Sequence, residues 1–292
     1  MLAVGAYWYV MDWPAKATFV TPEEKELVTA RLQADSDAVA DESVSWKNVL
    51  SAMSDYKVWL YGACFHTLSL PLYTLSMFLV IPSHDQTLSS ATKANAIIQP
   101  SIIKDLGYSA AEAQLLTIPP YALATILTVI YAVVSERYSR RGPFILFSTT
   151  IAIIGYIILL SNTSPKAKPG LSYVGVFFAA AGIYPSVALA LSWPAVNVSG
   201  QTKRATANAM QITIGNVGAV IGTQLYRPTG APRYVVGHGT ALGYLVGNLV
   251  VVSVIWWVHA RINRKRDREV AEGKRYEGEW LGDADQRWRF GL

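Results

Sequence analysis

The chain has 292 residues, of which 52% are hydrophobic and only 15% are charged, and its mean hydropathy is +0.27. The charges are gathered in short blocks, and several stretches of about 20 residues between them lack Asp, Glu, Lys and Arg. A soluble domain would interleave its charges along amphipathic helices. This pattern therefore excludes a soluble fold and predicts an all-α, polytopic helix bundle embedded in a lipid bilayer.

The basic balance of the chain also has a membrane explanation. A net charge of +5 and a pI of about 9.2 would suit a nucleic-acid-binding protein as well. The basic residues, however, stand at the ends of the apolar stretches, where membrane proteins carry them. We therefore expect no nucleic-acid partner.

Two regions precede the first full span. Residues 1–11 are apolar but too short to cross a bilayer, and they are expected to be the end of a truncated transmembrane helix. Residues 12–56 are polar and are predicted to form a cytosolic central loop with amphipathic helices. The segment Thr21–Glu24 has the pattern of a capping box, which predicts a helix start. A second helix is expected to lie along the membrane surface on an apolar face made of Trp46, Val49, Leu50 and Met53.

Residues 57–260 are predicted to form a transmembrane domain of six helices. Five spans are continuous apolar stretches: Val58–Leu79, Leu115–Val134, Pro143–Ser161, Val174–Trp193 and Gly237–Ala260. A sixth, Ala205–Leu225, is rich in Gly, Ala, Asn, Gln and Thr, which suits a helix packed closely inside a bundle. Residues 261–292 form a basic tail, whose first arginines and lysines are expected to act as a solvated cytosolic anchor.

The loop from Ser135 to Gly142 (SERYSRRG) joins two spans with an acid, three arginines and a glycine. It closely resembles the cytosolic loops of the major facilitator superfamily. In that resemblance Glu136 forms a charge relay with Arg140 or Arg141 that latches the helix pair in one state of a transport cycle. The resulting cytosolic gate motif comprises Glu136, Arg137, Arg140, Arg141 and Gly142. The alternative is that these arginines only flank the membrane on its positive side.

Further segments narrow this resemblance to one branch of that superfamily. They are Ile103–Ser109, Gln114–Tyr121, Arg140–Phe144, Ala181–Ser186, Asn197–Arg204 and Ala231–Gly239. In order and spacing they resemble the fungal allantoate and nicotinate permeases, the anion:cation symporters, from Thr21 to about Arg268. Members of that family consist of two six-helix halves that hold the substrate between them. The resemblance thus implies that this chain is the C-terminal half and that an N-terminal six-helix half is a missing partner.

The function implied by the resemblance is transport across a membrane, most naturally the plasma membrane. The substrate would be a small organic anion of the carboxylate, vitamin or ureide type, moved together with a proton. One alternative is a truncated membrane fragment that does not transport, or a half-carrier that acts only with a partner. A membrane-embedded enzyme is disfavoured because no acids or histidines cluster at membrane depth. The single Cys64 offers no disulfide or zinc site, and no cofactor or metal is predicted.

Residues 80–99 depart from the family pattern. They form a polar insertion between Leu79 and Pro100, where the family runs almost directly from the helix into the next motif. The insertion is interpreted as a translated intron, with a true extracellular loop as the alternative.

The candidate residues for the substrate path are the polar and aromatic side chains inside the spans: His66, Tyr73, Tyr121, Tyr184, Trp193, Asn208, Gln211 and Asn216. His66 is the histidine singled out as a candidate for proton coupling, so the coupling group is expected to be either His66 or part of the missing half. A histidine that is simply hydrogen-bonded inside the bundle is the alternative. The amides Asn208, Gln211 and Asn216 are expected near one helix face, where they line the cavity or bond to neighbouring helices. Asn162 begins a sequon on the extracellular side and is a candidate glycosylation site.

Overall fold

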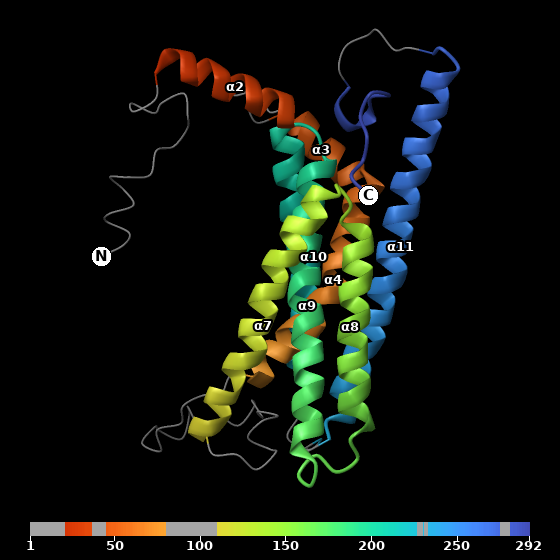
Figure 1. Cartoon of the computed structure of the whole chain (residues 1–292). Helices are drawn as coiled ribbons and strands as arrows, with labels where there is room; N and C mark the ends of the chain where they lie inside the picture. Colours follow the sequence, from red (N-terminus) through yellow and green to blue (C-terminus); the bar gives the residue numbers. More distant parts are fainter. Residues whose placement is uncertain (1–20, 37–44, 80–109, 227–229, 231–232, 275–280) are drawn as a thin grey trace.

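The computed structural model describes residues 21–36, 45–79, 110–226, 230, 233–274 and 281–292 (Figure 1). The apolar stub 1–11 and the insertion 80–99 lie outside these ranges.

The described residues form helices and no strands, which confirms the all-α prediction. The helices are α2 (Pro22–Ser36), α3 (Trp46–Ser54), α4 (Tyr56–Leu79), α7 (Ala110–Arg137), α8 (Gly142–Ser161), α9 (Pro169–Asn197), α10 (Gln201–Thr223), α11 (Val235–Ala271) and the short 3₁₀-helix η3 (Gly282–Ala284). Five predicted spans lie inside one long helix each, and the sixth runs slightly past the end of α10.

The first helix before the bundle begins as its local sequence predicts, and the second exposes most of its predicted apolar face. The Thr21 amide donates to Glu24 Oε2 at 2.9 Å, and the Glu24 amide donates to Thr21 Oγ1 at 3.4 Å, so the capping box of α2 is formed. On α3, Trp46, Leu50 and Met53 are exposed, as expected for a helix that lies on a membrane surface.

Four helices are long and apolar enough to cross a membrane: α8, α9, α11 and residues Leu115–Arg137 of α7. The helices α4 and α10 were predicted as spans too, but they fall short of that apolar composition among the described residues. The reason is visible in their packing. Ser69 Oγ of α4 donates to the Gly215 carbonyl of α10, and Gly218 lies against the backbone of His66. Helices that contact each other through small and polar residues can cross a membrane with a lower hydropathy than helices that face lipid.

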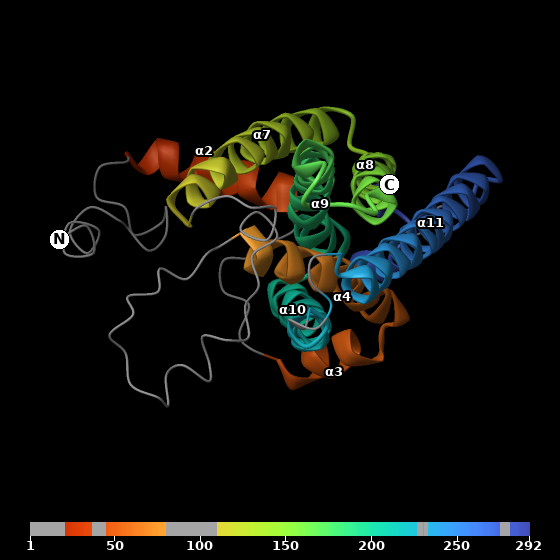
Figure 2. The same cartoon turned by 90° about the horizontal axis from the view of Figure 1, so that it is seen from below.

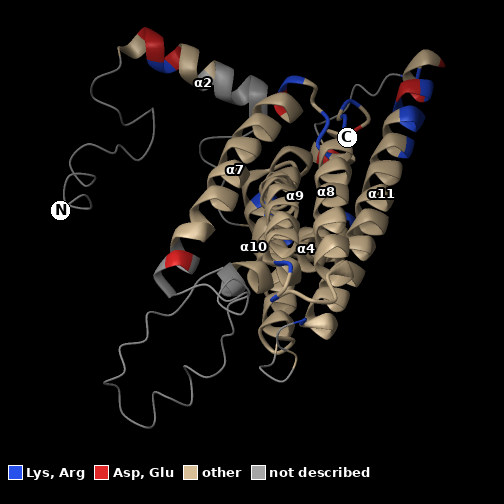
Figure 3. Ribbon diagram, turned by 60° about the horizontal axis from the view of Figure 1, so that its bottom comes forward, with Lys and Arg blue, Asp and Glu red and all other residues tan. Residues whose placement is uncertain are grey.

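The long helices run side by side with α4 at the centre, where it packs against α9, α10 and α11 (Figures 1 and 2). Helix α8 packs on α9 and α11, whereas α7 packs on α9. The predicted spans contain no Asp, Glu, Lys or Arg, and the charged residues of α7 and α11 lie toward the ends of these helices (Figure 3). With 20 residues, α8 is about 30 Å long, which matches the hydrocarbon thickness of a bilayer.

A buried polar network joins four of these helices at their centre. The Asn248 side chain of α11 donates to Thr67 Oγ1 of α4 at 2.9 Å and accepts from Thr149 Oγ1 of α8 at 3.1 Å. Thr149 in turn lies 3.2 Å from Ser186 Oγ of α9. Because buried polar groups are costly unless bonded, this network favours one relative placement of the four helices.

The closest helix approach is between α8 and α9. A Cβ atom on Gly182 would collide with the backbone of Ala152 and Ser148, and one on Gly155 would collide with Ala179 and Gly175. We therefore expect Gly182→Ala to lower the free energy of unfolding by about 1–3 kcal/mol, because the two helices must move apart.

Thermal unfolding of the detergent-purified protein measures this effect. Gly243→Ala is the matched control, since nothing lies within 4 Å of its Cβ position on α11, and it should leave stability unchanged or raise it by up to about 1 kcal/mol. Equal melting of the two variants would contradict the tight α8–α9 contact.

Candidate functional site

Two of the predicted path residues meet where α4, α7 and α9 converge. The rings of Tyr121 and Tyr184 lie 5.5 Å apart, edge to face. The Tyr184 hydroxyl is 3.0 Å from Ser76 Oγ of α4. Tyr73, one turn before Ser76, is 40% exposed. Tyr121, Tyr184 and Ser76 form a partly exposed hydroxyl cluster, here called the tyrosine cluster. Ser76 was not predicted, although its spacing of three from Tyr73 places both on one helix face.

Each helix of the tyrosine cluster carries an interior proline, which in α7 and α9 adjoins the cluster residue. Pro71 lies in α4, Pro119 and Pro120 directly precede Tyr121, and Pro185 directly follows Tyr184. A proline lacks the N–H group that would complete the helical ladder, so the backbone is weakened at these positions. The cluster therefore sits where the helices bend most easily, which is the arrangement expected around a transported substrate.

His66 lies away from the tyrosine cluster. Its Nδ1 is 3.1 Å from the Ile214 carbonyl of α10, and its ring centre is 5.7 Å from that of Tyr244 on α11. This placement, between three helices and bonded to a backbone carbonyl, fits a histidine that serves packing inside the bundle.

Trp193 is fully buried at the other end of α9 and also lies apart from the tyrosine cluster. Its ring contacts Tyr61 and His259, and its Nε1 donates to the Gly291 carbonyl at 3.1 Å. The structure thus gives Trp193 a role in holding the C-terminal residues.

The three amides of α10 differ in exposure, and Asn208 is partly buried. Gln211 is buried and donates to the Ala190 carbonyl of α9 at 2.8 Å, whereas Asn216 is exposed. Five residues along an α-helix correspond to a rotation of about 140°, so Gln211 and Asn216 point in different directions. The expectation of one shared amide face is wrong.

The gate motif forms the ion pair that the resemblance implies, between Glu136 and Arg141. Arg141 Nη2 lies 2.6 Å from Glu136 Oε2, and its Nη1 donates to the Ser192 carbonyl of α9 at 3.4 Å. Glu136 is 70% exposed along its side chain, so the pair contributes at most about 1 kcal/mol. Its geometric consequence is larger, because it connects the end of α7 to α8 and α9.

A feature that the sequence did not predict lies next to the gate motif. Residues 281–292, here called the docked tail, fold back against the same end of the bundle (Figure 1). The Asn263 side chain of α11 exchanges two hydrogen bonds with the Phe290 backbone, both 2.9 Å. Asn197 of α9 does the same with Gly291, at 3.1 and 2.7 Å. The amides of Arg141 and Gly142, at the start of α8, both donate to the Leu292 carbonyl.

Phe290 anchors the docked tail among cations and rings. It is 3% exposed and stacks on His259 with ring centres 4.8 Å apart. Lys57 Nζ lies 4.6 Å and Arg266 Cζ 5.1 Å from its ring centre. Arg266 also donates to the carbonyls of Asp283 and Trp288, both at 2.9 Å, so this arginine is part of a contact and not the solvated anchor that was expected.

Asp283 fixes the other end of the docked tail through a buried charge cluster. It pairs with Lys57 of α4 at 2.9 Å and with Lys203 of α10 at 2.7 Å, and Asp55 pairs with both lysines. Burial alone would raise the pKa of Asp283, but the adjacent lysines outweigh burial and lower it. Burial likewise opposes the charge of Lys203, yet the bonds to Asp283 and Asp55 raise its pKa.

Asn162 is unsuited to glycosylation in this structure, contrary to the expectation from its sequon. It ends α8 and is 2% exposed. Its Nδ2, the atom that would be glycosylated, donates to the Lys168 carbonyl and to Ser172 Oγ, both at 2.9 Å. The side chain is therefore used to close the α8–α9 loop.

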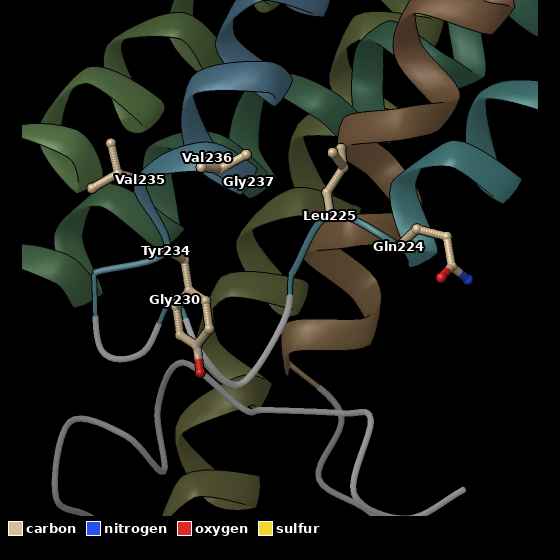
Figure 4. Close-up of a pocket in the computed structure, with 7 residues that line it drawn as sticks. All are labelled: Gln224, Leu225, Gly230, Tyr234, Val235, Val236 and Gly237. Atoms are coloured by element: carbon tan, nitrogen blue, oxygen red, sulfur yellow. The ribbon is translucent and has the colours of Figure 1, made fainter.

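A cavity of about 470 Å³ lies at the opposite end from the docked tail, where α10 leads into α11 (Figure 4). It is lined by Gln224, Leu225, Gly230, Tyr234, Val235, Val236 and Gly237. None of the predicted path residues contributes to this lining, so it adds no candidate to the site.

The charge cluster predicts that Asp283→Asn destabilises the protein by about 2 kcal/mol, because two buried lysines lose a counter-charge. Melting in detergent and the rate of tryptic cleavage after Arg287 and Arg289 report this loss. Asp267→Asn is the control, since its pair with Arg289 is exposed and should cost at most about 1 kcal/mol.

The same cluster predicts a flat pH dependence near neutrality. Because the pKa of Asp283 is lowered, its stabilisation is present above the ordinary carboxyl pKa of 3.8 and is lost as the pH falls through the lowered value. Because the pKa of Lys203 is raised, its contribution is present below the ordinary pKa of 10.5 and is lost as the pH rises through the raised value. Undocking of the tail between pH 6 and 8 would contradict this assignment.

Comparison with known proteins places this geometry in a family. Residues 17–260 match the family described as sugar (and other) transporter. An uncharacterised transporter of Schizosaccharomyces pombe is 30% identical over 96% of this chain and 51% of its own length. An MFS-type transporter of Penicillium expansum is 31% identical over 91% of the chain and 48% of its length.

A high-affinity nicotinic acid transporter of Saccharomyces cerevisiae is 28% identical over 93% of the chain and 47% of its length. The comparison with solved structures gives no significant match. The chain spans about half the length of the curated relatives it matches, which agrees with the resemblance to the C-terminal half of a carrier. It belongs to the sugar (and other) transporter family, within the major facilitator superfamily, and is an integral membrane protein.

Proposed function

We propose that the complete carrier to which this half belongs transports a small organic anion, of the carboxylate, vitamin or ureide type, coupled to protons. The tyrosine cluster is the observation that supports this most directly. It offers the hydroxyls of Tyr184, Ser76 and Tyr121 at weakened helix positions, and neutral hydroxyls suit carboxylate or amide oxygens. The cluster residues are only partly buried. The similarity to a nicotinic acid transporter points to the same substrate class.

The charges that an anion carrier needs are assigned to the other half. The six predicted spans contain no Lys, Arg, Asp or Glu. An anion near the bilayer midplane needs a cation or helix N-termini, and a coupled proton needs a titratable group. We assign both to the N-terminal half and place the complete carrier in the plasma membrane. The protein is thus a transporter and not an enzyme.

A half-carrier that acts only with a partner is the second candidate, and one observation favours it. The chain covers only about half the length of its relatives, so one wall of the substrate path is not part of it. Uptake of labelled nicotinate and related carboxylates in a transporter-deficient host separates the two candidates. One host expresses this chain alone. A second host expresses the protein that is encoded by the longest transcript of the same locus. Saturable uptake by the chain alone would contradict the need for a second half.

In the complete carrier, Tyr184→Phe and Ser76→Ala are each expected to raise KM about tenfold or more, because a hydroxyl that contacts a charged substrate is lost. Thr150→Ala is the control, since its hydroxyl is exposed on α8 and bonds only within its own helix. Uptake is normalised to the amount of carrier at the cell surface. A lower surface amount with an unchanged KM would reduce the tyrosine cluster to a structural contact.

His66→Gln is expected to leave the pH dependence of uptake unchanged, because glutamine keeps a hydrogen bond to the Ile214 carbonyl without titrating near neutral pH. Initial uptake rates between pH 5 and 8 measure this. If uptake by the unmodified carrier rises at acid pH and uptake by this variant does not, His66 is the coupling group instead.

A further inference from the structure

Helix α11 continues well past its predicted span, and its last turns have a distinct basic face. Arg261, Arg264, Lys265 and Arg268 follow the spacing i, i+3, i+4, i+7, which places them on one side of the helix. Trp257 lies one turn before Arg261 on that same side. All five side chains are exposed.

The acids of these turns are engaged elsewhere. Asp267 pairs with Arg289 of the docked tail at 2.8 Å, and Glu269 accepts from Gln286 of that tail at 3.2 Å. Of the basic face, Lys265 has a carboxylate near it, that of Glu269 at 3.8 Å. Within the described residues, the docked tail therefore engages both acids of α11, and the basic face carries four cations with one carboxylate, that of Glu269, at its edge.

The basic face borders a cleft of about 870 Å³ next to the start of α4. The cleft is lined by Tyr56, Trp257, Val258, Ala260, Arg261, Ile262, Arg264, Lys265 and Arg268, with no acidic residue among them. Inside it, the Arg261 guanidinium lies 5.1 Å from the centre of the Trp257 ring. Its lining thus grades from aromatic and apolar residues to cations along the helix.

The aromatic residues set the depth of this cleft in a membrane. Trp257 is 58% and Tyr56 57% exposed, and Trp and Tyr concentrate where the hydrocarbon meets the headgroups. On the neighbouring α3, exposed Trp46 and Leu50 offer a further apolar surface at the same end of the bundle. The cations of the cleft then stand one to three turns beyond the hydrocarbon edge, at the level of lipid phosphates.

We propose that this cleft binds an anionic phospholipid of the leaflet on the side of the docked tail. The phosphate and the acidic headgroup lie between Arg264, Lys265 and Arg268, and the glycerol and upper acyl chains contact Trp257 and Tyr56. The exposed aromatic rings favour a lipid over a free phosphate ion. A lipid covers these rings with its glycerol and acyl chains, whereas a free phosphate ion leaves the rings exposed to water. Binding of this lipid is independent of any transported substrate.

Native mass spectrometry of the purified full chain tests the proposal, with micelles doped with phosphatidylserine or with phosphatidylcholine of the same acyl chains. We expect phosphatidylserine to bind and to raise the melting temperature, and phosphatidylcholine to do neither. In Arg264→Gln/Arg268→Gln, the phosphatidylserine affinity should fall roughly fivefold for each neutralised residue, about 25-fold in all.

The matched control is Lys166→Gln/Lys168→Gln, which removes the same charge from exposed lysines at the other end of the bundle and should keep the affinity. Soluble glycerophosphoserine and inorganic phosphate are the headgroup controls and should not bind at the same concentrations. Equal phosphatidylserine binding by both double variants, or equal binding of the two lipids, would overturn the site. Binding of inorganic phosphate as tight as that of the lipid would overturn the choice of ligand.

Discussion

Contact between helices in a bilayer depends on close approach and buried hydrogen bonds, because lipid chains are as apolar as the side chains they touch. The rest of this bundle follows from that constraint. Gly155 and Gly182 let α8 and α9 approach until their backbones touch. The Asn248 network then links α4, α8, α9 and α11 through polar groups that have no water to replace their partners. Large apolar side chains occur both in the buried core and on the exposed faces of the helices.

At the end that carries the gate motif, where water returns, the docked tail takes over the same role with different chemistry. Asp283 joins α4 to α10 through two lysines, while the backbone of Phe290 and Gly291 joins α11 to α9. Leu292 accepts from the first amides of α8, which have no partner within their own helix. The docked tail thereby contacts five helices at this end of the bundle.

How far the sequence predicts this structure depends on the range of the interactions. The spans are predictable because a stretch of about 20 residues without charges is rare except in helices that cross a membrane. The start of α2 and the exposed face of α3 are set by residues within one or two turns. Tyr121 and Tyr184 could be named because each is an aromatic residue with a polar group inside an apolar span, although their contact with each other could not be predicted.

The failures arise where local patterns meet long-range packing. The sequon at Asn162 says nothing about burial of its Nδ2, and counting polar residues on α10 overlooked the rotation between Gln211 and Asn216. Residues 261–292 were predicted only as a basic tail, and the contacts of the docked tail were missed because its partners are distant in sequence. Lys57 and Asp283, for example, are separated by 226 positions.

The docked tail also determines what α11 presents to the membrane. A helix end that extends beyond the bilayer without tertiary contacts has no fixed orientation of its charged side chains. Here Asn263 and Arg266 are committed to the tail, and Asp267 and Glu269 turn toward it as well. Since Arg261, Arg264 and Arg268 are fixed on the same helix, they are held away from the tail and beside α4. The cohesion of the half-bundle at this end and its positive surface toward the lipid headgroups therefore have one structural cause.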